Sequence, residues 1–97
     1  MKTTTTIENK IATIAIEGSI DALTSGELDQ TIKETVPQCE KIILDMTGVD
    51  YISSAGLRVV VGANHAVGKD NLTLRGLAPN VFEIFRLTGF TKHLNIE

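Results

Sequence analysis

The chain has 97 residues, enough for one small domain, which excludes a second hydrophobic core and a large catalytic domain with a lid. Apolar residues make up 42% of the chain and charged residues 22%, which is typical of a globular protein and excludes intrinsic disorder. With 12 acidic and 9 basic residues the formal net charge is −3, which argues against direct binding of nucleic acid.

The first part of the chain predicts two extended segments joined by a tight turn. Residues 3–6 are four threonines, and the branched Cβ of threonine suits an edge strand. Residues 11–17 alternate between two largely apolar faces, which predicts a strand that is covered on both sides. The polar residues 8–10 between these segments suit a hairpin turn.

A helix is predicted to begin near Thr24 and to end before Pro37. Thr24 or Ser25 can cap its start, and Glu27 completes a capping box with Thr24. The apolar residues of its buried stripe recur every four positions: Leu28, Ile32 and Val36.

The middle of the chain predicts a second buried strand at residues 41–45, then a loop at residues 47–50. From Ser54 the spacing becomes helical again, and Gly68 suits the end of that helix. The apolar stripe of this helix consists of Leu57, Val60, Val61 and Val67.

The last third predicts a strand at residues 71–75, a helix between Pro79 and Gly89, and a short final strand at residues 93–96. Four large apolar side chains of that helix cannot all point inward, so we expect one or two of them to be exposed. They are Phe82, Ile84, Phe85 and Leu87.

The order of elements is therefore β-β-α-β-α-β-α-β in a single domain over residues 1–97. Strands that alternate with helices imply right-handed crossovers, so we predict an α/β fold with a mixed, mostly parallel sheet of four or five strands. Three helices in so short a chain cannot cover two faces evenly, and we expect them mainly on one face.

The stretch at residues 50–58 is the most informative one. Ser53 and Ser54 stand directly before the apolar stripe of a predicted helix, where backbone N–H groups lack partners. In one interpretation a serine oxygen is only the helix N-cap. In the other interpretation, one hydroxyl carries a phosphate, and the free N–H groups and partial positive charge of a helix N-terminus stabilise such an anion. Gly56 is unfavourable within a helix and hints that another surface approaches closely here.

Residues 52–57, Ile-Ser-Ser-Ala-Gly-Leu, resemble the central motif of STAS domains, a family named for sulphate transporters and anti-sigma factor antagonists. Residues 18–22 resemble the family's turn between its second strand and first helix. Residues 43–46, followed by residues 49–52, resemble its third strand and the lead into the motif. The resemblance covers nearly the whole chain in length and element order, and it implies a STAS-like fold.

The bacterial anti-sigma factor antagonists are the most similar type, because they are free-standing domains of about this size. The resemblance implies a partner switch: the unphosphorylated antagonist sequesters an anti-sigma factor, often a serine kinase, and a sigma factor is released. Phosphorylation of the motif serine breaks this complex, and a serine phosphatase restores it. The alternative is a constitutive STAS subunit of a transporter ATPase complex without regulatory phosphorylation.

The resemblance also implies roles for particular residues. Ser54 corresponds to the phosphoacceptor, and Ser53 occupies a position that is aspartate in several members of the family. Asp21 and Asp45 align with acidic positions that flank the site, although either could be an ordinary residue that binds loop amides. The residues expected at the partner surface are Asp21, Ser53, Ser54, Gly56 and Arg58.

Few features point to an enzyme. His65 follows Ser54 by 11 residues, about 16 Å along a helix, which is too far for a base that activates the serine. The single Cys39 excludes an internal disulfide or a multi-thiolate metal site, and His65 and His93 show no local ligand pattern. Nucleotide hydrolysis would rest only on Ser54 and the two aspartates. We expect a cytoplasmic protein without catalytic residues, metal, cofactor or membrane insertion.

Overall fold

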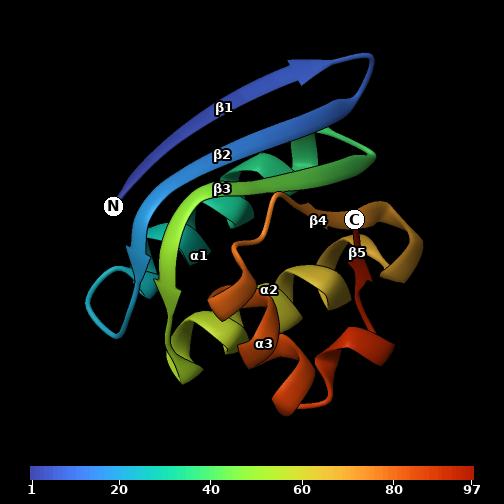
Figure 1. Cartoon of the computed structure of the whole chain (residues 1–97). Helices are drawn as coiled ribbons and strands as arrows, with labels where there is room; N and C mark the ends of the chain where they lie inside the picture. The colour runs from blue at the N-terminus through green and yellow to red at the C-terminus, as the bar shows by residue number, and fades with distance from the viewer.

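The computed structural model describes residues 1–97, apart from the side chain of Lys69. Five strands of the described chain form one sheet in sequence order, and helices connect the later strands (Figure 1). The strands are β1 (Lys2–Glu8), β2 (Ile11–Ile20), β3 (Lys41–Ile52), β4 (Leu72–Arg75) and β5 (Asn95–Ile96). The helices are α1 (Ser25–Thr35), α2 (Ser54–Val67) and α3 (Pro79–Leu87), with 3₁₀ turns at Val36–Gln38, Lys69–Asn71 and Phe90–Lys92. The predicted order of elements is confirmed.

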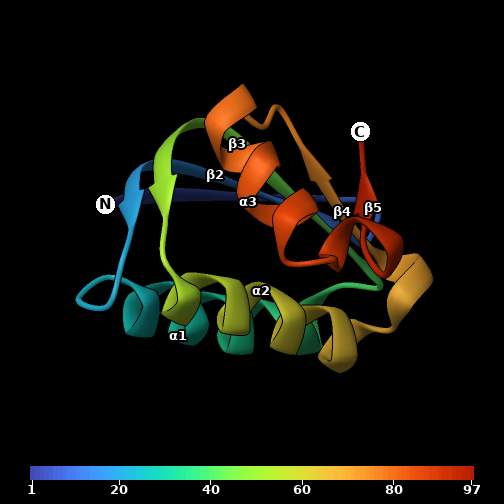
Figure 2. The same cartoon turned by 60° about the horizontal axis from the view of Figure 1, so that its bottom comes forward.

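The sheet is mixed, as predicted. β1 and β2 form an antiparallel hairpin around Asn9 and Lys10, whose φ angles of 51° and 65° suit a tight two-residue turn. The remaining neighbours are parallel, and the chain advances across the sheet in one direction from β2 to β5. Right-handed crossovers in one direction place the connecting helices on one face. Figure 2 shows α1 and α2 as a layer beneath the sheet, and the two helices pack together.

The core lies between the sheet and this helical layer. Alternate residues of the two central strands are fully buried: Ala12, Ile14 and Ile16 of β2, and Ile42, Leu44 and Met46 of β3. The prediction that the second strand is covered on both sides is wrong. On its other face Thr13 and Ala15 are only half-buried and Ile11 is 39% exposed, because the helices lie on the opposite side.

The central strands are longer than predicted, and the predicted loop at residues 47–50 is wrong. The register of β2 against β3 shifts at two irregularities, one between Ala15 and Glu17 and one between Gly18 and Ser19. Residues 17–20 of β2 pair with the second half of β3. This second half turns Val49 and Ile52 into the core and leaves Thr47, Gly48 and Asp50 exposed. The exposed polar residues resemble a loop in the sequence, although the backbone continues its ladder to Ile52.

The two larger helices begin and end close to their predicted positions. α1 ends two residues before Pro37, and Gly68 follows the last residue of α2. The predicted capping box does not form, because the Thr24 hydroxyl lies 2.8 Å from the backbone oxygen of Ser19 instead of capping the helix. Thr24 therefore stabilises the loop before α1. None of the described helices is long and apolar enough to cross a membrane.

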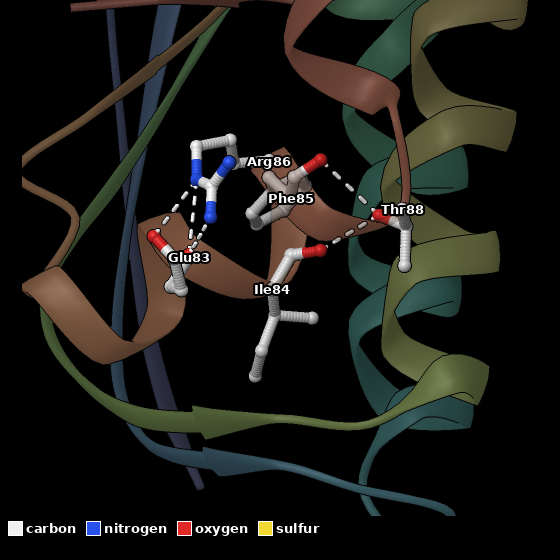
Figure 3. A network of polar contacts seen from close by, with 5 residues as sticks. All are labelled: Glu83, Ile84, Phe85, Arg86 and Thr88. Carbon is white, nitrogen blue, oxygen red and sulfur yellow. Dashed lines mark hydrogen bonds and ion pairs between the residues drawn. The ribbon is translucent and has the colours of Figure 1, made fainter.

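Helix α3 packs one side against β3 and leaves the other in solvent. Val81 and Phe85 are fully buried, whereas Phe82 is 38% and Leu87 71% exposed, so two of the large apolar side chains are exposed, as predicted. Its last turn is closed by Thr88, whose hydroxyl donates to the backbone oxygen of Ile84 at 2.7 Å (Figure 3). Glu83 and Arg86 form an ion pair on the exposed side, and the hydrogen bond from Arg86 lowers the pKa of Glu83.

The contrast between Phe85 and Phe82 gives a direct test of this core. Phe85→Ala is expected to lower the free energy of unfolding by about 3–5 kcal/mol, because it leaves a cavity in a closed core. Phe82→Ala, the matched control on the same helix, is expected to lower it by about 1 kcal/mol or less. Urea denaturation followed by circular dichroism measures both changes, and equal losses would contradict the described orientation of α3.

Candidate functional site

The candidate site lies where the carboxyl ends of β2 and β3 meet the N-terminus of α2. The backbone N–H of Ser53 donates to the backbone oxygen of Ile20 at 2.8 Å, so the start of the helix is tied to the end of β2. Ile20 and Ile52 are the last residues of their strands and pair with one another in the sheet. Loops at the carboxyl ends of parallel strands are the usual location of sites in α/β folds.

Ser53 is the N-cap of α2. Its backbone is extended, with φ −90° and ψ 174°, and its Oγ accepts a hydrogen bond from the Gly56 N–H at 3.2 Å. An aspartate at this position could cap the helix in the same way. The side chain of Ser53 is therefore engaged in holding the first turn of the helix.

Ser54 is the first residue of α2, and its side chain is exposed. Its hydroxyl makes no hydrogen bond with any residue that the structure describes, in contrast to the hydroxyl of Ser53. The N–H groups of Ser54 and Ala55 have no acceptor four residues earlier within the helix, so they add partial positive charge at this point. Of the two serines, Ser54 has the free hydroxyl and the surroundings that suit an anionic group.

Arg58 lies four residues after Ser54, which places the two side chains next to one another on the helix surface. Arg58 is exposed, and within the described part of the chain it has no ion-pair partner. A negative group on Ser54 would meet both the positive end of the helix and this guanidinium.

Gly56 is buried at the junction between helix and sheet. A Cβ at this residue would lie 2.7 Å from Cγ2 of Ile20 and 2.8 Å from Cγ1 of Ile52. The side chains that approach Gly56 closely therefore belong to β2 and β3 of the same chain. Direct contact of Gly56 with a partner stays a prediction, and the structure gives the residue a role in packing.

Asp21 organises the loop between β2 and α1. Its Oδ1 accepts hydrogen bonds from the N–H groups of Leu23 at 2.9 Å and Thr24 at 3.0 Å. The bond from the Thr24 N–H is the main reason that the pKa of Asp21 lies below its usual value. Asp21 directly follows Ile20, to which Ser53 is bonded, so the loop lies beside the start of α2. Its carboxylate holds the loop in shape, as the simpler interpretation of this residue predicted.

Asp45 does not lie beside the serine. It stands within β3, seven residues before the end of the strand, and pairs with Ala15 and Arg75. Its carboxylate accepts hydrogen bonds from the hydroxyl and the N–H of Thr47, which lower its pKa, and it lies 3.7 Å from Arg75. The structure therefore brings together Asp21, Ser53, Ser54, Gly56 and Arg58, and it leaves Asp45 in the sheet.

Residues that sequence reasoning did not single out also lie at this end of the strands. Asp50 accepts a hydrogen bond from the hydroxyl of Ser19 at 2.8 Å, and its backbone oxygen accepts one from the Asn80 side chain at 2.9 Å. These bonds tie β2 and α3 to the end of β3. Three apolar side chains come from the same segments and are exposed: Leu23 by 89%, Tyr51 by 48% and Phe82 by 38%. Phe82 is one of the four side chains of which one or two were expected to be exposed. For Leu23 the signal in the sequence is its position in a polar turn, and no comparable signal marks Tyr51.

The two histidines lie elsewhere. His65 and His93 line a cavity of about 510 Å³ at the C-terminal end of α2, together with Val61, Phe90 and Leu94. Val61, the lining residue of α2 nearest to Ser54 along the chain, lies about two helical turns after it. Among the described residues, no group of three or more His, Cys, Asp or Glu side chains is placed to hold a metal ion.

Comparisons with known proteins agree with the described fold. The STAS domain family model matches residues 2–97. The anti-sigma-B factor antagonist of Listeria monocytogenes is 34% identical over 88 residues, which are 87% of this chain and 76% of that protein. An anti-sigma factor antagonist from Mycobacterium paratuberculosis has the same fold, with a TM-score of 0.89 at 22% identity over 98% of this chain and 83% of that one. So does the Bacillus cell fate determinant SpoIIAA in its phosphorylated form, with a TM-score of 0.75 at 14% identity over 99% and 91%.

Two glycines of α2 test the packing at Gly56. Gly56→Ala is expected to lower the free energy of unfolding by roughly 1–3 kcal/mol, because the new methyl group overlaps Ile20 and Ile52. Gly62→Ala is the matched control, since a Cβ there meets nothing within 4 Å, and it is expected to raise the same free energy by roughly 0.5–1 kcal/mol. A Gly56→Ala variant as stable as Gly62→Ala in urea denaturation would contradict the described junction.

The lowered pKa of Asp21 predicts an acid-sensitive contribution to stability. A carboxylate with a lowered folded-state pKa stabilises the fold above its unfolded-state pKa of about 3.9, and this stabilisation is lost as the pH falls through the folded-state value. Asp21→Ala should therefore unfold at lower urea concentration than the wild type at pH 7, and the difference should shrink below about pH 4. Asp21→Asn keeps an acceptor for the loop N–H groups, so its deficit at pH 7 should be smaller than that of Asp21→Ala. Because neither variant titrates at this position, both deficits should fall by the same amount as the pH drops. A constant difference for Asp21→Ala across this range would contradict the described role.

Proposed function

The chain belongs to the STAS domain family, and from this premise we propose that it is an anti-sigma factor antagonist controlled by phosphorylation of Ser54. In its unphosphorylated form the chain binds and sequesters an anti-sigma factor, and this binding releases a sigma factor for transcription. A phosphate on Ser54 weakens the complex, and its removal restores binding. The chain is then a protein-binding switch that acts in the cytoplasm, where sigma factors meet RNA polymerase.

The free hydroxyl of Ser54 at the start of α2 is the observation that carries this proposal. Ser53 caps the helix through its own Oγ, so phosphorylation of Ser54 leaves the cap in place. A phosphoserine brings about −1.5 to −2 charges at neutral pH. The formal net charge of −3 would then become roughly −4.5 to −5. The positive end of the helix and Arg58 can accept this charge, so the fold is expected to persist while its surface changes.

The surface around Ser54 suits a protein partner. Leu23, Tyr51 and Phe82 offer apolar area at the carboxyl ends of the strands, and Arg58 offers a positive charge next to the serine. Aromatic side chains and arginine are enriched at protein interfaces, and tyrosine and arginine are among the residues that contribute most binding energy there. A phosphate within such a contact must be desolvated when the complex forms, which opposes binding.

The kinase and the phosphatase are expected to be separate proteins. Among the described residues, no side chain accepts a hydrogen bond from the Ser54 hydroxyl, and His65 lies about three turns further along the helix. We propose that the anti-sigma factor is itself a serine kinase that phosphorylates Ser54, and that a serine phosphatase removes the phosphate. The chain contributes the acceptor and the binding surface, and its partners contribute the catalysis.

The proposal predicts the site of phosphorylation. Incubation with ATP and each anti-sigma serine kinase of the same genome should add one phosphate, and peptide mass spectrometry should place it on Ser54. Ser54→Ala should abolish the modification, whereas Ser53→Ala, the matched control, should retain it at a lower stability because the helix loses its cap, at a cost of about 1 kcal/mol.

Binding to the same kinase should change with the phosphate. The unphosphorylated chain should bind in isothermal titration calorimetry, and the phosphorylated chain should bind at least about tenfold more weakly, equivalent to about 1.4 kcal/mol. Phosphate that persists in Ser54→Ala would contradict the proposal. So would equal affinities of the two forms, or stable recovery of a transporter ATPase without any phosphate on Ser54.

A further inference from the structure

Strand β1 is an edge strand whose outer side is open. It pairs with β2 on one side only, and of its seven residues all but Thr3 are exposed. The opposite edge of the sheet ends in β5, which has two residues. Natural proteins protect a long edge strand with proline, bulges or inward-pointing charges, because its unpaired backbone groups can bind another strand. β1 contains no proline, and its register against β2 is regular from Lys2 to Glu8.

The hairpin geometry determines which backbone groups of β1 face outward. In a two-residue hairpin the residues that flank the turn exchange hydrogen bonds, and these bonded pairs alternate along the ladder. Three pairs therefore exchange backbone hydrogen bonds between β1 and β2: Glu8–Ile11, Thr6–Thr13 and Thr4–Ala15. The N–H and C=O groups of Thr3, Thr5 and Ile7 then point to the open side of β1.

We propose that β1 binds β1 of a second copy of this chain, antiparallel and with Thr5 opposite Thr5 of the second copy. In this register the outward-facing groups of the two copies meet, with Thr3 opposite Ile7 and Thr5 opposite Thr5. Each of these facing pairs exchanges two backbone hydrogen bonds. The two sheets thereby continue into one another across a twofold axis, as in other isologous dimers.

The charges at the two ends of β1 are complementary to those of a second copy of β1 in this register, and they identify a second copy as the binding partner. When Thr5 lies opposite Thr5, Lys2 of one copy lies opposite Glu8 of the other, and the same pair recurs at the other end of the ladder. These residues form pairs that do not exchange backbone hydrogen bonds, in which opposing side chains lie closest. A shift by two residues in either direction places at least one of these charges opposite a threonine. Within the described part of the chain, neither Lys2 nor Glu8 has an ion-pair partner.

The pairing leaves the phosphorylation site free. Ser54 lies at the start of α2, beyond the carboxyl ends of β2 and β3, whereas β1 forms the outer edge of the sheet (Figure 1). A dimer formed through β1 therefore presents two copies of the Ser54 surface. This inference does not depend on the proposed function, because it concerns a different surface.

Charge reversal at the two ends of β1 tests the proposal. Sedimentation equilibrium of the untagged chain, from about 10 µM to about 1 mM, should reveal a reversible dimer. Lys2→Glu and Glu8→Lys each place like charges opposite one another at both ends, so each should weaken the dimer about tenfold or more. An equimolar mixture of the two variants should dimerise like the wild type, because each copy then meets the opposite charge.

A second variant separates the edge from other surfaces. Thr5→Pro removes an N–H that faces outward, so the monomer should keep its circular dichroism spectrum while the dimer is lost. A wild type that is monomeric at the highest concentration would overturn the proposal. So would a dimer that persists in Thr5→Pro, or a mixture of the charge variants that stays monomeric. A fourth result would also overturn the proposal: a monomeric wild type that binds another protein, with this binding lost in Thr5→Pro. In that case the edge of β1 would bind a strand of the other protein.

Discussion

The close contact between the first turn of α2 and the ends of β2 and β3 determines the geometry of the whole site. The Ser53 N–H donates to Ile20, and Gly56 leaves space for Ile20 and Ile52 at distances that no Cβ would tolerate. These contacts place Ser53 in the capping position with its side chain engaged. Ser54 follows as the first helical residue, so its hydroxyl faces solvent at the positive end of the helix.

Much of the fold could be predicted because the spacing of apolar residues and the positions of helix-ending residues agree along the chain. The helical stripe after Ser54, Pro37 after α1 and Gly68 after α2 mark elements that the structure contains. The sequence wrongly predicted that both faces of β2 are buried. Small residues such as Ala15 suit a half-covered face as well as a buried one, so the pattern does not distinguish the two cases. The second half of β3 was missed for a related reason. Its residues Thr47, Gly48 and Asp50 face solvent, and a bulge interrupts the regular alternation.

The candidate site was predictable where local chemistry determines it and unpredictable where tertiary contacts do. Two serines before an apolar stripe indicate a capped helix start, yet only the structure distinguishes the engaged hydroxyl of Ser53 from the free one of Ser54. Alignment with acidic positions placed Asp45 near the site, whereas the strand register holds it beside Arg75 and far from the end of β3. Spacing alone predicts that one or two large apolar side chains of α3 are exposed. The packing of the helix against β3 determines that these are Phe82 and Leu87.

A phosphate on Ser54 is proposed to change the charge of one surface without rearranging the fold. The most direct test compares amide ¹H–¹⁵N NMR spectra of the chain before and after phosphorylation. We expect large chemical-shift changes confined to the first turn of α2 and the adjoining loop at Asp21, with the amide shifts of the buried strands unchanged. Shifts that spread through the core residues of β2 and β3, or broad loss of dispersed signals, would contradict it.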